Sequence, residues 1–405
     1  MIKSNLIQNE KLVQFKVHKW ALFCFFVITT LPPLRYNQTI YWSSIVLTAV
    51  ILCYMILLSK VRVNGYIIWG FVVNFCILLS VLWANNIDLA RSGVAGSLAV
   101  FIPYTYMSML IKEKEDIYEL LKLFIYSKVI MALYIIINVD VTTLEGIRIG
   151  VDVLGEGWNA NYIGMNMAIS SFILVLLIKT TKIKKIKLLY ILLISLFTFL
   201  TLLSGSRKAL FILIFSIGLF IIFSSKKHKV GKATIVLLLT TLTFYLVMNI
   251  PFFYDVLGVR LEGFLANFTD TGVVDGSTAL RMTMIEQGLL YFYEQPVLGY
   301  GINNFQQLFA STFGYSHNNY IELLVGIGLF GTIVYYLGYT YIIKKTYNVK
   351  GNLYAFAFVS VLTIVIIDTG LVSYNAFYIQ FLICISFSII SIQKKVSIPN
   401  KKGSL

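Results

Sequence analysis

The sequence predicts an all-α polytopic membrane protein with about 12 transmembrane helices. Of its 405 residues, 58% are hydrophobic and only 13% are charged, and the mean hydropathy is +0.82. A soluble fold of this length could not bury so much apolar surface. The apolar residues also occur in runs of about the 20 residues that a helix needs to cross ~30 Å of hydrocarbon. Short basic tethers separate these runs, so we expect one multi-span domain over residues 1–405.

Twelve apolar runs are candidate spans, of which the first, seventh and eighth are short. The basic N-terminal segment resembles the start of a signal peptide, but the run after it has no small-residue cleavage site, so we expect a retained first span. The predicted spans are Trp20–Leu34, Tyr41–Ser59, Tyr66–Ala84, Ser92–Ile111, Tyr118–Asn138, Asn159–Ile178, Leu188–Leu203, Ala209–Ser224, Ala233–Ile250, Asn318–Ile343, Leu353–Leu371 and Tyr374–Ile392.

The distribution of cations sets the predicted orientation. With the N-terminus in the cytoplasm, the cytoplasmic tethers and tails hold 24 of the 33 Lys and Arg residues, and the opposite side holds seven. This asymmetry follows the positive-inside rule and predicts a multi-pass protein of the cytoplasmic (inner) membrane with both termini in the cytoplasm. It also explains the net charge of +15 as a topology signal, which argues against nucleic acid as a partner.

Arginine and lysine are not distributed alike. Six of the seven arginines lie on the predicted outer side, but only one of the 26 lysines clearly does. A guanidinium group binds phosphate through two parallel hydrogen bonds and stays charged in a partly desolvated site. The bias therefore favours phosphate recognition outside the membrane. The alternative is a chance distribution in which the arginines pair with nearby carboxylates.

One stretch, Pro251–His317, contains no candidate span and forms one long extracytoplasmic loop (251–317) in this prediction. Loops of this length commonly carry function. Within it, Ser277–Glu294 has apolar residues at helical spacing, which predicts an amphipathic helix against the membrane or over the spans. Arg281 falls in the first turn of that helix. It is either a phosphate ligand or the ion-pair partner of an acid such as Glu286 or Asp275.

Two more positions on the predicted outer side could take part in chemistry. Arg207 follows a tight turn at Ser204–Ser206 and is either a phosphate ligand or a snorkelling cation beside a span. His317 is the one histidine of three on this side, and it is either catalytic or structural. No second outward His or Cys accompanies it, so we expect neither a metal nor another cofactor. Gly326 and Gly328, which follow it, indicate close helix packing.

Taken together, Arg207, Arg281 and His317 suit a lipid-linked pyrophosphate that arrives from the outer leaflet. The arginines would neutralise the departing pyrophosphate, where negative charge develops in the transition state. A neutral imidazole would accept the proton of the attacking hydroxyl.

Four segments together resemble a known family: SGSRKALF, ALRMTMIEQGL, QPVLGYGINNF and HNNYIELLVGIGLFG. Their order is similar to the signature of the O-antigen ligase and polymerase superfamily, and the resemblance covers roughly Ser204–Gly331. Members of that superfamily are multi-span glycosyltransferases that act on polyprenyl-pyrophosphate-linked glycans outside the cytoplasmic membrane. The resemblance implies a GT-C-like fold and a metal-independent, inverting glycosyl transfer.

The resemblance also implies roles for individual residues. Arg207 and Arg281 would bind the pyrophosphate, and His317 would activate or position the acceptor. Family members often have Glu before the hydrophobic-Gly pair of the tenth span, where this chain has Gly326, with Glu322 one turn earlier. The motifs assign no place to the remaining candidate supporting residues, which are Arg260, Arg148, Asn318 and Glu286.

The predicted function is polymerisation of polyprenyl-pyrophosphate-linked repeat units in capsular, O-antigen or exopolysaccharide assembly. The alternative within the class is a ligase that moves the glycan to lipid A core or to a protein. The alternative outside it is a flippase or transporter, which would show internal pseudo-symmetry and broken helices near mid-membrane; neither is clear in the sequence. Expected partners are the lipid-linked donor and acceptor, membrane lipid, a chain-length regulator and a flippase.

Overall fold

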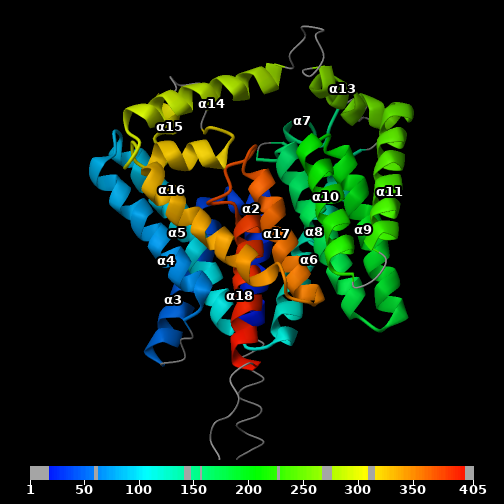
Figure 1. Ribbon diagram of the computed structural model, residues 1–405, viewed down its shortest axis with the longest axis horizontal. Coiled ribbons are helices and arrows are strands. Elements are labelled where there is room, and N and C mark those ends of the chain that lie inside the picture. Colours follow the sequence, from blue (N-terminus) through cyan, green and yellow to red (C-terminus); the bar gives the residue numbers. More distant parts are fainter. Residues whose placement is uncertain are drawn as a thin grey trace, which may run out of the picture.

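The computed structural model describes residues 18–58, 63–140, 147–155, 157–225, 229–266, 276–308 and 315–396. In these ranges the chain is helical and contains no strand. The long helices stand side by side in one bundle, and shorter helices cover one end of it (Figure 1). The predicted all-α polytopic membrane fold is confirmed.

Each of the twelve predicted spans overlaps one long helix. In the described residues, eight helices are long and apolar enough to cross a membrane. That all twelve cross it stays a prediction. The long helices are His18–Thr30, α3 (Gln38–Leu57), α4 (Gly65–Leu79), α5 (Ile87–Leu110), α6 (Lys114–Asn138), α8 (Ala160–Thr180), α9 (Lys184–Leu203), α10 (Arg207–Phe223), α11 (Lys229–Asn249), α16 (Asn319–Thr346), α17 (Asn352–Ile367) and α18 (Phe377–Val396).

Burial differs between the helices as expected for a bundle in lipid. Most of α8 is buried, and α8 contacts α6, α9, α10 and α17. Helices α3 and α11 are mostly exposed, although their exposed side chains are apolar, as at Leu237, Leu238 and Leu239. Apolar surface of this kind is suited to hydrocarbon rather than water, because a helix satisfies its own backbone groups.

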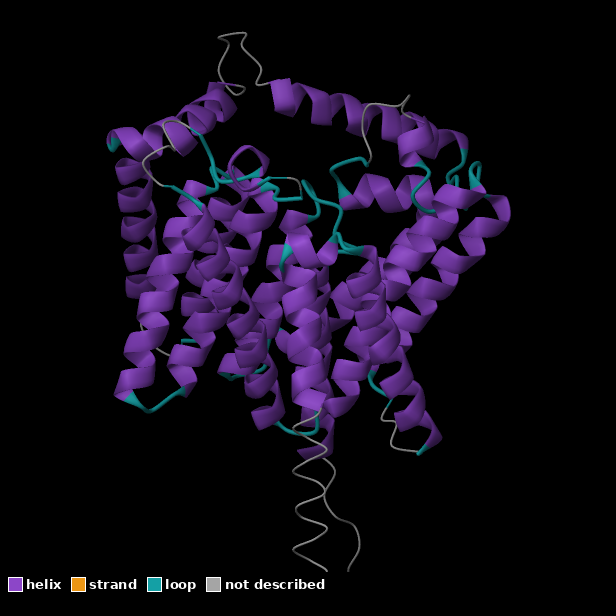
Figure 2. Ribbon diagram, turned by 180° about the vertical axis from the view of Figure 1, so that it is seen from behind, coloured by secondary structure: helices purple, strands orange, loops and turns teal. Residues whose placement is uncertain are grey.

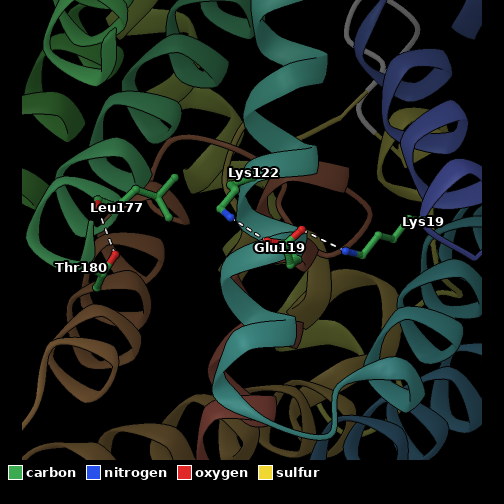
Figure 3. Close-up of polar contacts among 5 residues, drawn as sticks. All are labelled: Lys19, Glu119, Lys122, Leu177 and Thr180. Atoms are coloured by element: carbon green, nitrogen blue, oxygen red, sulfur yellow. Dashed lines mark hydrogen bonds and ion pairs between the residues drawn. The ribbon is translucent and has the colours of Figure 1, made fainter. Parts of the chain in front are cut away.

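An acidic side chain joins the first helix to α6 at the end of the bundle that is predicted to be cytoplasmic. The Glu119 carboxylate accepts hydrogen bonds from the Lys19 Nζ at 2.9 Å and from the Lys122 Nζ at 2.6 Å (Figure 3). On α8, Thr180 closes the last turn by donating from Oγ1 to the Leu177 carbonyl at 3.0 Å. The shared carboxylate offsets part of the repulsion between the two lysines.

The predicted loop 251–317 is largely helical where it is described. It contains α12 (Pro251–Phe253), a π-helix (Tyr254–Gly258), α13 (Val259–Ala266), α14 (Gly276–Glu294) and α15 (Phe305–Leu308). Together with α2 (Pro32–Arg35) and α7 (Val151–Leu154), these short elements lie at one end of the bundle (Figures 1 and 2). The sequence signal for most of them is weak because they are short.

The helix predicted over Ser277–Glu294 is α14, which begins one residue earlier. It lies over the bundle, because its buried Met284 packs with Phe305, Ile321 and Val325. A Cβ on Gly288 would lie 2.3 Å from the Ile321 side chain, so the two helices are in close contact there. The apolar face of α14 thus fixes this helix on the N-terminal part of α16.

Helix α16 is broken at Gly328, which the sequence did not predict. Gly328 has φ 66°, a left-handed conformation that favours glycine. The segment Pro296–Phe305 fills the break: Tyr300 N donates to the Val325 carbonyl at 2.7 Å, and Leu329 N donates to the Pro296 carbonyl at 2.8 Å. The groups freed by the break are therefore bonded to protein, as the membrane interior requires.

The predicted boundary between the last two spans is wrong by several residues. Helix α17 ends at Ile367 rather than Leu371, and α18 begins at Phe377 rather than Tyr374. The segment between them, Asp368–Ala376, is called the α17–α18 loop below. Its backbone and the Asp368 carboxylate bond to the start of α16 instead of continuing a helix.

We expect Gly328→Ala to destabilise the protein by at least about 2 kcal/mol. The reason is that the new Cβ would lie 2.1 Å from the Val297 carbonyl oxygen, at a positive φ. Thermal unfolding of the purified protein in detergent, followed by tryptophan fluorescence, measures the effect. The matched control is Gly231→Ala in α11, where nothing lies within 4 Å of the added Cβ. Equal unfolding midpoints for the two variants would contradict this account of the break.

Candidate functional site at the outer end of the bundle

A tight turn places Arg207 at the first position of α10. Gly205 in this turn has φ 57°, and Ser206 caps the helix by accepting a hydrogen bond from Ala209 N at 3.3 Å. The Arg207 guanidinium donates from Nη1 to the Arg260 carbonyl at 2.9 Å. A Cβ on Gly205 would lie 3.2 Å from the Arg148 Cβ. Two predicted supporting residues, Arg148 and Arg260, are therefore neighbours of the Arg207 turn.

Lys208 is a cation of this region that the sequence analysis counted but did not assign. Its Nζ donates to the carbonyl of Gly370 in the α17–α18 loop. Lys208 therefore connects the start of α10 to the loop that precedes α18. Its place in the site follows only from this tertiary contact. In the sequence, a lysine after an arginine at a span boundary does not indicate a functional role.

His317 has an unusual backbone conformation that its neighbours hold in place. Its φ is 55°, which is uncommon for a residue other than glycine. Before it, Ser316 N donates to the Glu322 carboxylate at 2.9 Å. After it, the Asn318 carbonyl accepts from the Ser316 hydroxyl at 2.7 Å, and the Asn318 side chain caps α16. Strained residues held in this way are concentrated at functional sites.

Asn319 joins the His317 segment to the α17–α18 loop. Its backbone N donates to the Asp368 carbonyl at 2.8 Å. Its side-chain oxygen accepts from Ser373 N at 2.9 Å and from Tyr374 N at 3.1 Å. Asn318 adds a bond from Nδ2 to the Thr369 carbonyl at 3.3 Å. The loop thus lies between Lys208 on one side and the His317 segment on the other.

Electrostatics place Arg281 beside His317. Burial, together with the positive charges of Arg281 and Lys208, lowers the pKa of the His317 imidazole to about 4. The ring of Tyr315 lies 4.1 Å from the His317 ring, centre to centre. Burial raises the pKa of the Tyr315 phenol, and Arg281 opposes that shift. At neutral pH the imidazole is therefore uncharged, with cations around it.

The structure brings the three principal candidates to one end of the bundle. Arg281 and Lys208 act on His317 directly, and Arg207 precedes Lys208. Glu286 is exposed on α14, and the ion pairs among the described residues do not include one between it and Arg281. The other proposed ion-pair partner of Arg281, Asp275, lies outside the described residues.

Comparison with protein families finds one family model that matches part of the chain. Residues 191–336 match the model of the O-antigen ligase family. The match confirms the predicted resemblance to the O-antigen ligase/polymerase superfamily over this segment. The matched segment runs from α9 to α16 and includes Arg207, Arg281 and His317. It supports an O-antigen ligase or polymerase type of function in glycan assembly, with lipid-linked glycans as the substrate class. No curated protein matches the chain.

We expect NMR titration of His317, labelled with carbon-13, to give a pKa of about 4 in the intact protein. Its resonance is identified by its loss in His317→Gln. Replacing Arg281 with Gln removes a cation that disfavours the imidazolium, so the pKa should rise toward the ordinary value of about 6.5.

The matched control is Arg91→Gln. Arg91 lies on the same predicted side, pairs with Asp88 at 3.6 Å and has a side chain that is 71% exposed. Its loss should leave the His317 pKa unchanged. An identical His317 pKa in wild type and Arg281→Gln would show that Arg281 does not act on the imidazole.

Proposed function

We propose that the protein is a polymerase of polyprenyl-pyrophosphate-linked oligosaccharide repeat units in surface glycan assembly. The observation that carries the proposal is an uncharged, partly buried His317 with the charges of Arg281 and Lys208 acting on it. Arg207 adds a guanidinium beside Lys208. A base flanked by cations is the arrangement that a hydroxyl attack on a sugar diphosphate requires.

The donor diphosphate binds to Arg207 and Arg281. One N–H of Arg207 is directed to the Arg260 carbonyl, which orients the guanidinium, and the group has five N–H donors in total. As the bond between the anomeric carbon and the diphosphate oxygen breaks, negative charge builds on that oxygen. Cations that are already in position stabilise this charge without reorganising at the moment of reaction.

His317 takes the proton of the acceptor. The acceptor hydroxyl oxygen attacks the anomeric carbon from the face opposite the diphosphate, the proton passes to the imidazole, and the configuration at the anomeric carbon inverts. A pKa of about 4 makes the free imidazole a weak base. The negative charge of the bound diphosphate offsets Arg281, so binding of the donor raises the pKa of His317 toward the working pH.

A ligase is the second candidate, because the matching family model is that of O-antigen ligase. It would use the same donor and the same three residues, but a different acceptor, such as lipid A core or a protein. The family match gives no support to the transporter alternative, and the break at Gly328 is filled by Pro296–Phe305 rather than left to line a pathway.

We also propose where the protein acts in the cell and which proteins act before and after it. The active site lies on the extracytoplasmic side of the cytoplasmic membrane, with both termini in the cytoplasm. A flippase supplies the lipid-linked units, and a chain-length regulator acts on the product.

Purified protein incubated with one defined lipid-linked repeat unit should form a ladder of polymers. In this assay, Arg207→Lys and Arg281→Lys should each lower the rate by about 10- to 100-fold, because Lys keeps the charge but loses the two-pronged hydrogen bonding. Arg91→Lys is the matched control and should keep the wild-type rate. Wild-type rates in both site variants would show that Arg207 and Arg281 do not bind the diphosphate through two-pronged hydrogen bonds. Transfer that needs a second, different acceptor would favour the ligase.

Replacing His317 with Ala should lower the rate by about 10²–10⁴-fold, since that is the usual contribution of a positioned general base. The amount of variant in the membrane and its unfolding midpoint should match wild type. Full activity in this variant would assign His317 a packing role only.

The reaction should proceed unchanged after treatment with EDTA, because the proposed chemistry uses cationic side chains where other glycosyltransferases use a metal. The comparison is made at saturating donor, with and without added Mg²⁺ after chelation. Loss of activity that Mg²⁺ restores would contradict a metal-independent transfer.

A further inference from the structure

Arg35 is an outward cation to which neither the motifs nor the family match assigns a role. It is the last residue of α2, in the short connection between the first helix and α3. Its guanidinium carbon lies 5.4 Å from the centre of the Phe377 ring and 5.7 Å from that of Tyr162. These rings belong to α18 and α8, so three parts of the bundle hold Arg35 in place. A guanidinium has five N–H donors, so the ring contacts and a hydrogen bond to the Tyr162 side chain leave several of them for a ligand.

Arg35 has no carboxylate partner among the residues that the structure describes. Among the described residues, the ion pairs join Glu119 with two lysines and Asp88 with Arg91, and Arg35 is in none of them. Arg35 is only partly exposed. A half-buried cation at a span end is energetically unfavourable unless an anion accompanies it. The aromatic rings fix its position, but they do not supply that anion.

Arg35 lies on the His317 side of the site. Phe377, which contacts it, follows the α17–α18 loop, and Asn319 accepts hydrogen bonds from Ser373 and Tyr374 in that loop. Tyr36, which is next to Arg35, is 64% exposed and within electrostatic reach of Tyr315, the ring neighbour of His317. Arg207, Lys208 and Arg281 therefore form one group of cations, and Arg35, whose charge is not among those that act on His317, forms a second.

Two cation groups match the substrates of a repeat-unit polymerase, because its donor and its acceptor each carry a lipid diphosphate. We propose that Arg35 binds the diphosphate of the lipid-linked acceptor, while Arg207 and Arg281 bind that of the donor. This inference rests on the proposed function. The connection that carries Arg35 joins the outer ends of two spans, which is the level at which a lipid anchored in the outer leaflet presents its phosphates.

Binding of geranylgeranyl diphosphate to the purified full chain in a neutral detergent tests the site without catalysis. Isothermal titration should give two molecules bound per wild-type chain. Arg35→Gln should retain one, Arg281→Lys should weaken the other, and Arg91→Gln should retain both. A single site in the wild type, or two sites of unchanged affinity in Arg35→Gln, would overturn the inference.

A competition arm distinguishes a substrate diphosphate from an ordinary anionic lipid headgroup. Phosphatidylglycerol at a tenfold excess should leave the Arg35-dependent site occupied by geranylgeranyl diphosphate. If phosphatidylglycerol displaces the probe at equal concentration, Arg35 binds anionic headgroups in general and the acceptor assignment is wrong.

Kinetics with separated substrates test the acceptor role. The donor is a repeat unit with its terminal hydroxyl methylated, and the acceptor carries a non-cleavable phosphonate link to its lipid diphosphate. Arg35→Gln should raise the KM for this acceptor by about tenfold or more, as expected for loss of a charge-assisted bond, with little change in kcat or in the KM for the donor. Arg35→Lys should have a smaller effect.

A soluble acceptor glycan without lipid diphosphate supplies the control. Its KM should be the same in wild type and Arg35→Gln, because it has no phosphate to bind. Equal losses with both acceptors would show that Arg35 only holds the helices together. If the wild type forms no polymer but still binds two prenyl diphosphates, the polymerase function fails and the Arg35 site stands.

Discussion

Positive charge gathered around one uncharged imidazole is the constraint on which the rest of the site depends. Arg281 and Lys208 both act on His317, and Arg207 adjoins Lys208 in the chain. Like charges repel, and they repel more strongly in a partly desolvated region than in water. The carbonyls of Gly370 and Arg260 accept hydrogen bonds from Lys208 and Arg207 and so fix their directions. Burial and the charges of Arg281 and Arg207 lower the pKa of Lys208 to about 7, but arginine keeps its charge, so the site retains a field that attracts anions.

Buried polar side chains hold the His317 segment and the α17–α18 loop in place. Asn319 is buried and bonds to the α17–α18 loop through both its backbone and its side chain. Glu322 is buried as well and accepts from Ser316 N, which fixes the residue before His317. Hydrogen bonds between buried groups are strong where water is excluded, and leaving one of these polar groups unpaired would cost free energy of folding. These hydrogen bonds therefore hold His317 in its left-handed conformation on a rigid helix end.

The sequence predicted the bundle better than it predicted the contacts within the site. Apolar runs depend on the bilayer alone, so the helices could be predicted from the chain, and the outward side of the arginines, which rests on cation counts, stays a prediction. Lys208, Glu322 and the α17–α18 loop acquire their roles through contacts between segments far apart in sequence. Most of Asp368–Ala376 was assigned to two predicted spans, because the apolar residues on both sides of this segment give no sequence signal for a turn. The break at Gly328 was missed because glycine in a span is equally typical of close helix packing, and only the Pro296–Phe305 segment shows why it is needed.

The same charges predict the order in which donor and acceptor bind in the proposed reaction. Without a donor, burial and the charges of Arg281 and Lys208 keep the His317 imidazole a weak base, so an acceptor hydroxyl that arrives first gains little from it. A bound diphosphate changes the sign of the local field, which makes the imidazole more basic at the moment when a sugar diphosphate is present. A donor-first order follows from the coupling between one anion and one base, without any movement of the helices.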